Sequence, residues 1–307
     1  MSPSAPERDT AVGPSVRQVL DELAGAVGDA QDGGRILAEV LGVPLASLAV
    51  DPGAVVPAGA RQRAIDMAQR CAEGEPLQHV LGTWGFRKLD VVVDARALVP
   101  RPETEELVDV ALAQLRDRAE RSGRDAAAPL VAVDLGTGSG VIALSLAAEG
   151  PAALEVWATE RATDAMALAR CNLERLAAAH PGPAGRVHLS AGSWFESLPQ
   201  RLRGSVDLVV SNPPYVSQAE WEQLDPVVRD HDPYPALVPG PTGLEALAQV
   251  VDQSLQWLAP GASLVVELAP WQADQVLERA RWCGYGGAEA HLDLTGRPRF
   301  VVARRPA

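Results

Sequence analysis

VAVDLGTGSG, residues 131–140, is the stretch that decides the fold. It begins as a short β-branched run typical of a buried strand, and it ends in glycines at alternate positions before the helix-like segment 141–148. Such glycines let the backbone approach a ligand closely and present a helix N-terminus to it. The pattern therefore predicts a strand, a ligand-binding loop and a helix, although nicotinamide and flavin sites use related loops.

Glu160 follows the next predicted strand, residues 154–158, and stands 24 residues beyond Gly136. A doubly wound α/β fold places an acidic residue at about this spacing on ribose hydroxyls. The alternative is an ordinary solvated acid at a helix start.

The tetrapeptide Asn212-Pro213-Pro214-Tyr215 directly follows the strand-like run 206–211. The Asn212 carboxamide oxygen and the Pro213 carbonyl can accept hydrogen bonds from a planar NH2 group, and the Tyr215 ring can cover its π face. Accepting both protons directs the nitrogen's electron density at an incoming carbon. The alternative is a Pro-Pro turn that only ends the strand.

From residue 130 onward, short apolar runs alternate with amphipathic helical patterns. Such alternation predicts a largely parallel sheet covered on both faces. The last connection, through Gly296 and Pro298, is too short for a crossover, so the final strand should be antiparallel. The predicted strands are residues 130–134, 154–158, 186–190, 206–210, 262–267, 287–292 and 299–304.

Together these residues resemble an S-adenosylmethionine-dependent methyltransferase of the seven-stranded Rossmann-like class. The segments PRPETEELV at 100–108 and NPPY at 212–215 are similar to the release-factor glutamine N5-methyltransferase family, and the similarity extends from about residue 70 to the C-terminus. On its own, 100–108 can also be a proline-stiffened linker before a helix. The resemblance implies S-adenosylmethionine as cofactor and, as substrate, the glutamine of the Gly-Gly-Gln motif in peptide-chain release factors.

The resemblance also assigns roles to individual residues. Asn212 would contact both the cofactor and the substrate. Together with Pro213, Pro214 and Tyr215 it would hold the glutamine amide. The catalytic residues would be Asn212, Pro213 and Tyr215. Trp194, whose alternative role is core packing, would lie by the adenine. The remaining cofactor-binding residues would be Gly136, Thr137, Gly138, Ser139, Gly140 and Glu160.

Three positions depart from the family pattern. The family usually has Asp at the position of Glu160, an acidic residue at the position of Ser193 and Glu at the position of Asp232. Ser193 can accept only a neutral, weaker hydrogen bond from an adenine amino group.

Composition separates the alternatives for the substrate. A net charge of −13 argues against broad binding to a phosphate backbone, so no direct nucleic acid contact is expected. Three alternatives stay open. The protein could be an amino-group methyltransferase acting on adenine or guanine, an enzyme that methylates another protein's glutamine, or a non-catalytic protein that binds the cofactor or a release factor.

The domain organisation is expected to comprise four parts. Residues 1–14 read as a disordered tail, 15–82 as a helical substrate-recognition domain, 83–102 as a hairpin linker and 103–307 as the methyltransferase domain. Helices are predicted over 16–27, 34–41 and 58–72, a hairpin between 86–93 and 97–99, and a helix end and loop over 116–128.

The chain shows no long apolar run and no signal-like N-terminus, so we expect a cytoplasmic protein that binds no membrane. We also expect a monomer. The three cysteines lie far apart in sequence and the five histidines are scattered, so neither a disulfide scaffold nor a metal site is expected.

Overall fold

The computed structural model describes residues 13–121 and 129–307, and it divides between Leu81 and Gly82 into two compact units. The predicted disordered tail lies outside the described residues as far as residue 12, and so does the predicted loop over 122–128. No helix within the described ranges is both long and apolar enough to cross a membrane.

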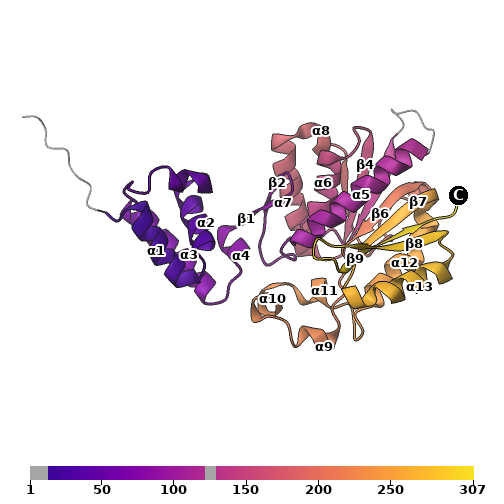
Figure 1. Ribbon diagram of the computed structural model, residues 1–307. Helices are drawn as coiled ribbons and strands as arrows, with labels where there is room; N and C mark the ends of the chain where they lie inside the picture. The colour runs from indigo at the N-terminus through magenta and orange to yellow at the C-terminus, as the bar shows by residue number, and fades with distance from the viewer. Residues whose placement is uncertain (1–12, 122–128) are drawn as a thin grey trace, which may run out of the picture. The chain divides into compact units, whose positions relative to one another are not determined.

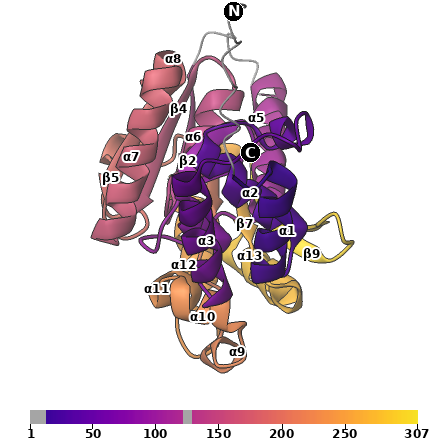
Figure 2. The same ribbon diagram turned by 90° about the vertical axis from the view of Figure 1, so that its left-hand side faces the viewer.

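The N-terminal unit is a group of helices whose three longest members pack against one another (Figure 2). Ser15 and Gln18 open the first helix by reciprocal bonds between side chain and backbone. Val19, Leu23, Ile36 and Leu37 are fully buried between the helices. The elements are α1 (Val16–Val27), α2 (Ala30–Leu41), η1 (Leu45–Ala49), α3 (Ala58–Ala72) and α4 (Leu77–Leu81).

Helix α2 begins four residues earlier than the predicted start at residue 34. The Asp29 side chain accepts hydrogen bonds from the backbone N–H groups of Gln31 and Asp32, which starts the helix ahead of its glycines. A Cβ at Gly33 would lie 3.0 Å from Ala24 N on α1. The glycine pair that suggests a later start is therefore buried inside α2, and Gly33 allows α1 and α2 to approach closely.

The second unit begins with a hairpin of β1 (Thr83–Phe86) and β2 (Leu89–Val92). The predicted pairing of 86–93 with 97–99 is wrong, because the chain already reverses at Arg87 and residues 97–99 lie in a turn and loop. Arg87 adopts φ 53°, and its guanidinium stabilises this conformation by ion pairs of 2.7 Å with Asp109 and with Glu149.

The core of this unit is a seven-stranded sheet in the order β5-β4-β3-β6-β7-β9-β8. The first five strands in this order are parallel, and β9 is antiparallel to both of its neighbours, which confirms the predicted fold class and the antiparallel last strand. The strands are β3 (Leu130–Leu135), β4 (Leu154–Glu160), β5 (Val187–Ala191), β6 (Val206–Ser211), β7 (Leu258–Glu267), β8 (Gly287–Leu292) and β9 (Pro298–Arg304).

Helices cover both faces of the sheet (Figure 1). One core lies beneath α5 (Pro102–Arg121), α6 (Val141–Glu149) and α7 (Thr163–Ala179), and the other beneath α12 (Glu245–Trp257) and α13 (Ala273–Cys283). Alternate residues of β9 enter the two cores, as the pleat of a strand requires. The shorter elements are α8 (Pro181–Ala184), η2 (Gln200–Leu202), α9 (Gln218–Trp221), α10 (Pro226–His231), α11 (Tyr234–Leu237) and η3 (Pro270–Gln272).

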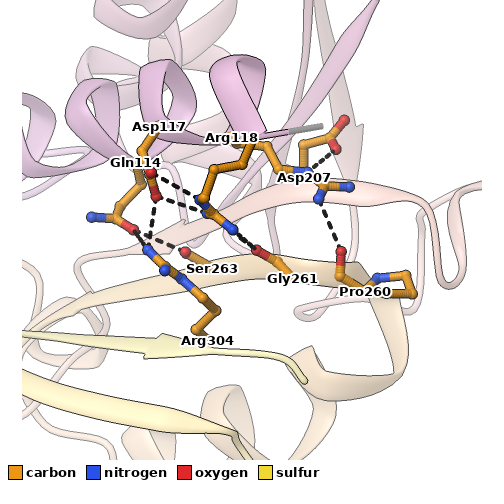
Figure 3. Close-up of polar contacts among 9 residues, drawn as sticks. Gln114, Asp117, Arg118, Asp207, Pro260, Gly261, Ser263 and Arg304 are labelled. Carbon is orange, nitrogen blue, oxygen red and sulfur yellow. Dashed lines mark hydrogen bonds and ion pairs between the residues drawn. The ribbon is translucent and has the colours of Figure 1, made fainter. Parts of the chain in front are cut away.

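Polar side chains bind the C-terminal half of α5 to the sheet (Figure 3). Arg118 Nε lies 2.9 Å from Asp207 Oδ1 at the start of β6, and its Nη1 donates to the Pro260 carbonyl on β7. On the same side, Ser263 Oγ on β7 donates to Gln114 Oε1 at 2.9 Å. The Asp207 side chain is only 1% exposed, and Arg118 is one of the groups that compensate its charge, together with the Val131 N–H, which donates to Oδ2 at 3.1 Å.

Replacing Arg118 by Met should lower the free energy of unfolding by about 3 kcal/mol, because it removes the guanidinium from a buried carboxylate. Arg121→Met is the matched control. Its pair with Asp117 is 38% and 39% exposed and should contribute less than about 1 kcal/mol. Chemical denaturation followed by tryptophan fluorescence measures this unit, since all seven tryptophans lie in it. Equal losses in the two variants would contradict this account.

Candidate functional site

A pocket of about 230 Å³ lies where the parallel strands end. The loops after β3, β4, β5 and β6 supply four of its walls, as expected for an open α/β sheet. The segment 96–101 before α5 and residues between 233 and 249 supply further walls, and Thr104, Val141, Ile142 and Ala165 contribute from the first turns of α5, α6 and α7. All lining residues belong to the second unit.

The glycine-rich loop presents its backbone to this pocket. Gly136, Gly138 and Gly140 have φ values of 70°, 56° and 90°, a left-handed conformation that glycine adopts without strain. A Cβ at Gly138 would meet only Ala97 Cβ, at 4.0 Å, so the loop backbone is open on this side. Gly140 is the N-cap of α6, and the helix begins at Val141. The loop can therefore accommodate a ligand in close contact with its backbone.

Glu160 lies opposite this loop, at the end of β4. Its Oε2 accepts from Gly138 N at 3.0 Å, and its Oε1 accepts from Ala162 N at 2.8 Å. Each carboxylate oxygen has about two acceptor positions, so each keeps one for a further donor. Two adjacent free acceptor positions suit a vicinal pair of hydroxyl groups.

Trp194 lies beside the glycine loop. Its Cζ3 atom is 3.4 Å from the position a Cβ would take at Gly136, and its Nε1 donates to Gln249 Oε1 at 2.8 Å. The residue adopts φ 47°, a conformation that costs energy for a non-glycine residue. This constrained indole gives the pocket a flat aromatic surface, next to which Ser193 also lines the wall.

Asn212 lines the pocket on the side of β6. Its Nδ2 donates to Thr104 Oγ1 at 3.1 Å, and Thr104 Oγ1 donates to Glu267 Oε2 at 2.9 Å. The described residues donate no hydrogen bond to Asn212 Oδ1, so this acceptor is available to a ligand.

Tyr215 turns toward the sheet. Its hydroxyl donates to Glu267 Oε1 at 3.2 Å, and burial together with the Glu267 charge raises the pKa of this phenol. The ring is partly buried against the core beneath α12 and α13. Tyr215 is not among the residues that line the pocket.

An ion pair between a buried carboxylate and a partly exposed arginine joins two walls of the pocket. Asp232 Oδ2 lies 2.6 Å from Arg101 Nη2, and its Oδ1 accepts from Val99 N at 3.2 Å. Asp232 thereby binds the segment before α5 to the loop that contributes Pro233 and Pro235 to the lining.

Most of the predicted site residues meet in this one pocket. Pro213, Tyr215 and Gly140 lie next to lining residues but do not line it themselves. Residues that line the pocket are Gly136, Thr137, Gly138, Ser139, Glu160, Ser193, Trp194, Asn212 and Pro214. Within the described residues, no three or more His, Cys, Asp or Glu side chains are arranged to hold a metal ion.

Sequence reasoning missed two buried carboxyl groups beside the pocket, Asp134 and Glu267. Both stand at or near the end of a predicted strand, and Asp134 lies within the stretch 131–140, but neither position by itself indicates a role. Asp134 Oδ2 accepts from Thr137 Oγ1 at 2.5 Å and from Ala143 N at 3.1 Å. Burial raises the pKa of Asp134 to about 7 in spite of these two donors, which act in the opposite direction.

The raised pKa of Asp134 should make stability depend on pH. The folded protein holds the proton more tightly than the unfolded chain, so stability should fall as the pH rises from about 4 to about 7 and level off above that. Asp134→Asn should reduce this loss by on the order of 3 kcal/mol. Unfolding free energies measured at pH 5 and pH 8 in both proteins test this. An equal pH dependence in wild type and variant would rule it out.

Two family models match the chain: the methyltransferase small domain over residues 125–226, and the PrmC N-terminal domain over residues 16–82. A release factor glutamine methyltransferase from Deinococcus radiodurans is 40% identical over 282 residues, covering 92% of this chain and 93% of the relative. Another, from Streptomyces coelicolor, is 41% identical over 236 residues, covering 75% and 76%.

Solved structures are similar in fold at low sequence identity. The human METTL16 N-terminal domain in complex with SAH has a TM-score of 0.51 at 15% identity, covering 78% of this chain and 83% of that one. The hMettl16 catalytic domain in complex with the MAT2A 3′UTR hairpin 6 has a TM-score of 0.53 at 15% identity, covering 82% and 84%.

Proposed function

Because this chain belongs to the release factor glutamine methyltransferase family, we propose that it methylates the side-chain nitrogen of the glutamine in the Gly-Gly-Gln motif of peptide-chain release factors. The observation that carries the proposal is the meeting of two kinds of residue in one pocket. A glycine loop, a carboxylate and an indole lie on one side. A carboxamide oxygen that accepts no hydrogen bond from the described residues lies on the other.

The first group fits S-adenosylmethionine. The open backbone at Gly138 suits the methionine and ribose parts, the remaining acceptor positions of Glu160 suit the ribose hydroxyls, and the Trp194 indole suits the adenine. When bound, this cofactor supplies a methyl group on a sulfonium.

Asn212 provides the chemistry toward the substrate. An amide nitrogen is a weak nucleophile because its electron pair is conjugated with the carbonyl. Asn212 Oδ1 and the Pro213 carbonyl would accept the two N–H groups, which orients the nitrogen and stabilises the positive charge that develops on it. The chain therefore acts by positioning and electrostatics, and no covalent intermediate with an enzyme residue is required.

We assign substrate recognition to residues 15–82 and catalysis to residues 103–307. The match of residues 16–82 to the PrmC N-terminal domain supports this division. The net charge of −13 favours a protein target over a nucleic acid. Because release factors act in translation, the cytoplasm is the proposed location.

Mass spectrometry of a cognate release factor, incubated with the protein and S-adenosylmethionine, tests the proposal. We expect a gain of one methyl group on the Gly-Gly-Gln glutamine. Asn212→Ala should lower the rate on the order of 10² to 10³-fold, because it removes a positioned acceptor, while S-adenosylhomocysteine still binds.

A release factor with glutamate in place of this glutamine is the substrate control and should gain no methyl group. A methyl gain elsewhere would move the assignment to another protein glutamine. No gain despite cofactor binding would call first for a different protein substrate and then for adenine- or guanine-containing nucleic acid. Unchanged turnover in Asn212→Ala would exclude the role given to Asn212.

A further inference from the structure

One buried carboxyl group lies behind both ends of the Asn-Pro-Pro-Tyr segment. Glu267 Oε2 accepts a hydrogen bond from the Thr104 hydroxyl at 2.9 Å, and Thr104 Oγ1 in turn accepts a hydrogen bond from Asn212 Nδ2 at 3.1 Å. Glu267 Oε1 accepts a hydrogen bond from the Tyr215 hydroxyl at 3.2 Å. Glu267 is 1% exposed and Thr104 is 3% exposed, so water does not compete for these bonds.

The chemistry of this chain of hydrogen bonds fixes its direction. An ionised carboxylate only accepts, so the single proton of the Thr104 hydroxyl goes to Glu267. Thr104 Oγ1 can then only accept a hydrogen bond from Asn212. The Asn212 carboxamide must therefore turn its NH2 group toward Thr104. The carboxamide oxygen of Asn212 then takes the other position, where no described residue donates a hydrogen bond to it.

We propose that Glu267 is a positioning residue for the reaction proposed above, on which this inference rests: through Thr104 it holds the Asn212 carboxamide with Oδ1 facing the pocket. Tyr215 completes the arrangement, because its bond to Glu267 fixes the far end of the same tetrapeptide. Glu267 itself does not line the pocket, whereas Thr104 and Asn212 do, so its effect reaches the substrate through these two residues.

The protonation state of Glu267 controls this arrangement. The titratable and charged groups that face it are Glu103 on α5, Tyr215 after β6 and Arg299 on β9. Burial raises the pKa of Glu267 to about 7, and the Thr104 hydrogen bond and Arg299 oppose that rise. When Glu267 is protonated, Thr104 no longer has to donate to it, and the Thr104 proton becomes available to Asn212 Oδ1. The carboxamide then loses its fixed orientation.

Kinetics of methyl transfer give the first test. Thr104→Val, which keeps the shape and removes the hydroxyl, should lower kcat by about 10 to 100-fold and leave the Kd of S-adenosylhomocysteine unchanged. Thr104→Ser should restore most of kcat. Ser263→Ala is the matched control, since Ser263 and Gln114 form a hydrogen bond between the same α5 and β7 away from the pocket, and it should retain the wild-type kcat.

The pH profile separates positioning from a merely structural role. Between pH 8 and pH 6 the ionised fraction of a group with pKa 7 falls about tenfold, so the wild-type kcat should fall by a similar factor. Glu267→Gln should have a lower kcat that is flat over this range. A wild-type profile in Glu267→Gln, or a wild-type kcat in Thr104→Val, would overturn the proposal.

A second measurement does not depend on turnover. The chain contains only two asparagines, Asn172 and Asn212, so selective [15N]asparagine labelling gives two side-chain amide signals. Asn172 is an internal reference, because its carboxamide bonds to the backbone of Val92 and to the Ser139 carbonyl. The Asn212 signal should titrate near pH 7 in the wild type and stay constant in Glu267→Gln, and the Asn172 signal should behave alike in the two proteins.

The two tests fail in different ways. If the wild type transfers no methyl group to a release factor, the proposed function is wrong, and the amide titration still decides the orientation of Asn212. If the Asn212 signal has the same chemical shift and the same pH dependence in the wild type and in Glu267→Gln, the positioning by Glu267 is overturned, whatever the turnover assay gives.

Discussion

The structure depends on the burial of two sheet carboxylates, each of which has its partner on α5. At the pocket end Thr104 donates to Glu267 on β7, and toward the other end Arg118 pairs with Asp207 on β6. About 20 Å of helix separates these two contacts. Between them, fully buried leucines such as Leu107 and Leu115 pack on the sheet. The helix therefore cannot shift without exposing apolar surface or leaving a buried charge less compensated.

This constraint connects stability to the site. Asn212 follows β6 in sequence, but its carboxamide is oriented by a threonine on α5. The glycine loop after β3 and Glu160 after β4 reach the same place because parallel strands end at one edge of the sheet. Asn172 on α7 adds a further connection, since it binds both Val92 in the hairpin and the Ser139 carbonyl in the loop. The pocket is thus positioned by the sheet and by helices that lie far from it in sequence.

The sequence predicts the parts of this structure that rest on local patterns. The seven strands, the glycine loop and the Asn212 turn follow from periodicity and motif, and the structure bears out the fold class. It does not predict features set by distant partners. Gly33 stays within a helix because α1 packs against it, and the β1–β2 hairpin turns at Arg87 because Asp109 and Glu149 bind its guanidinium. The Glu267 contact with Thr104 spans 163 residues, so no window of sequence contains it.

The departures from the family pattern are easier to understand in this light. Glu160 is one methylene longer than the usual Asp, and its two oxygens bind Gly138 N and Ala162 N on either side. The longer side chain is therefore held rigidly, and the cost in side-chain entropy is met on folding and not on ligand binding. Asp232, one methylene shorter than the usual Glu, still reaches Arg101 at 2.6 Å. At both positions the neighbouring backbone or arginine binds the carboxylate in spite of its changed length.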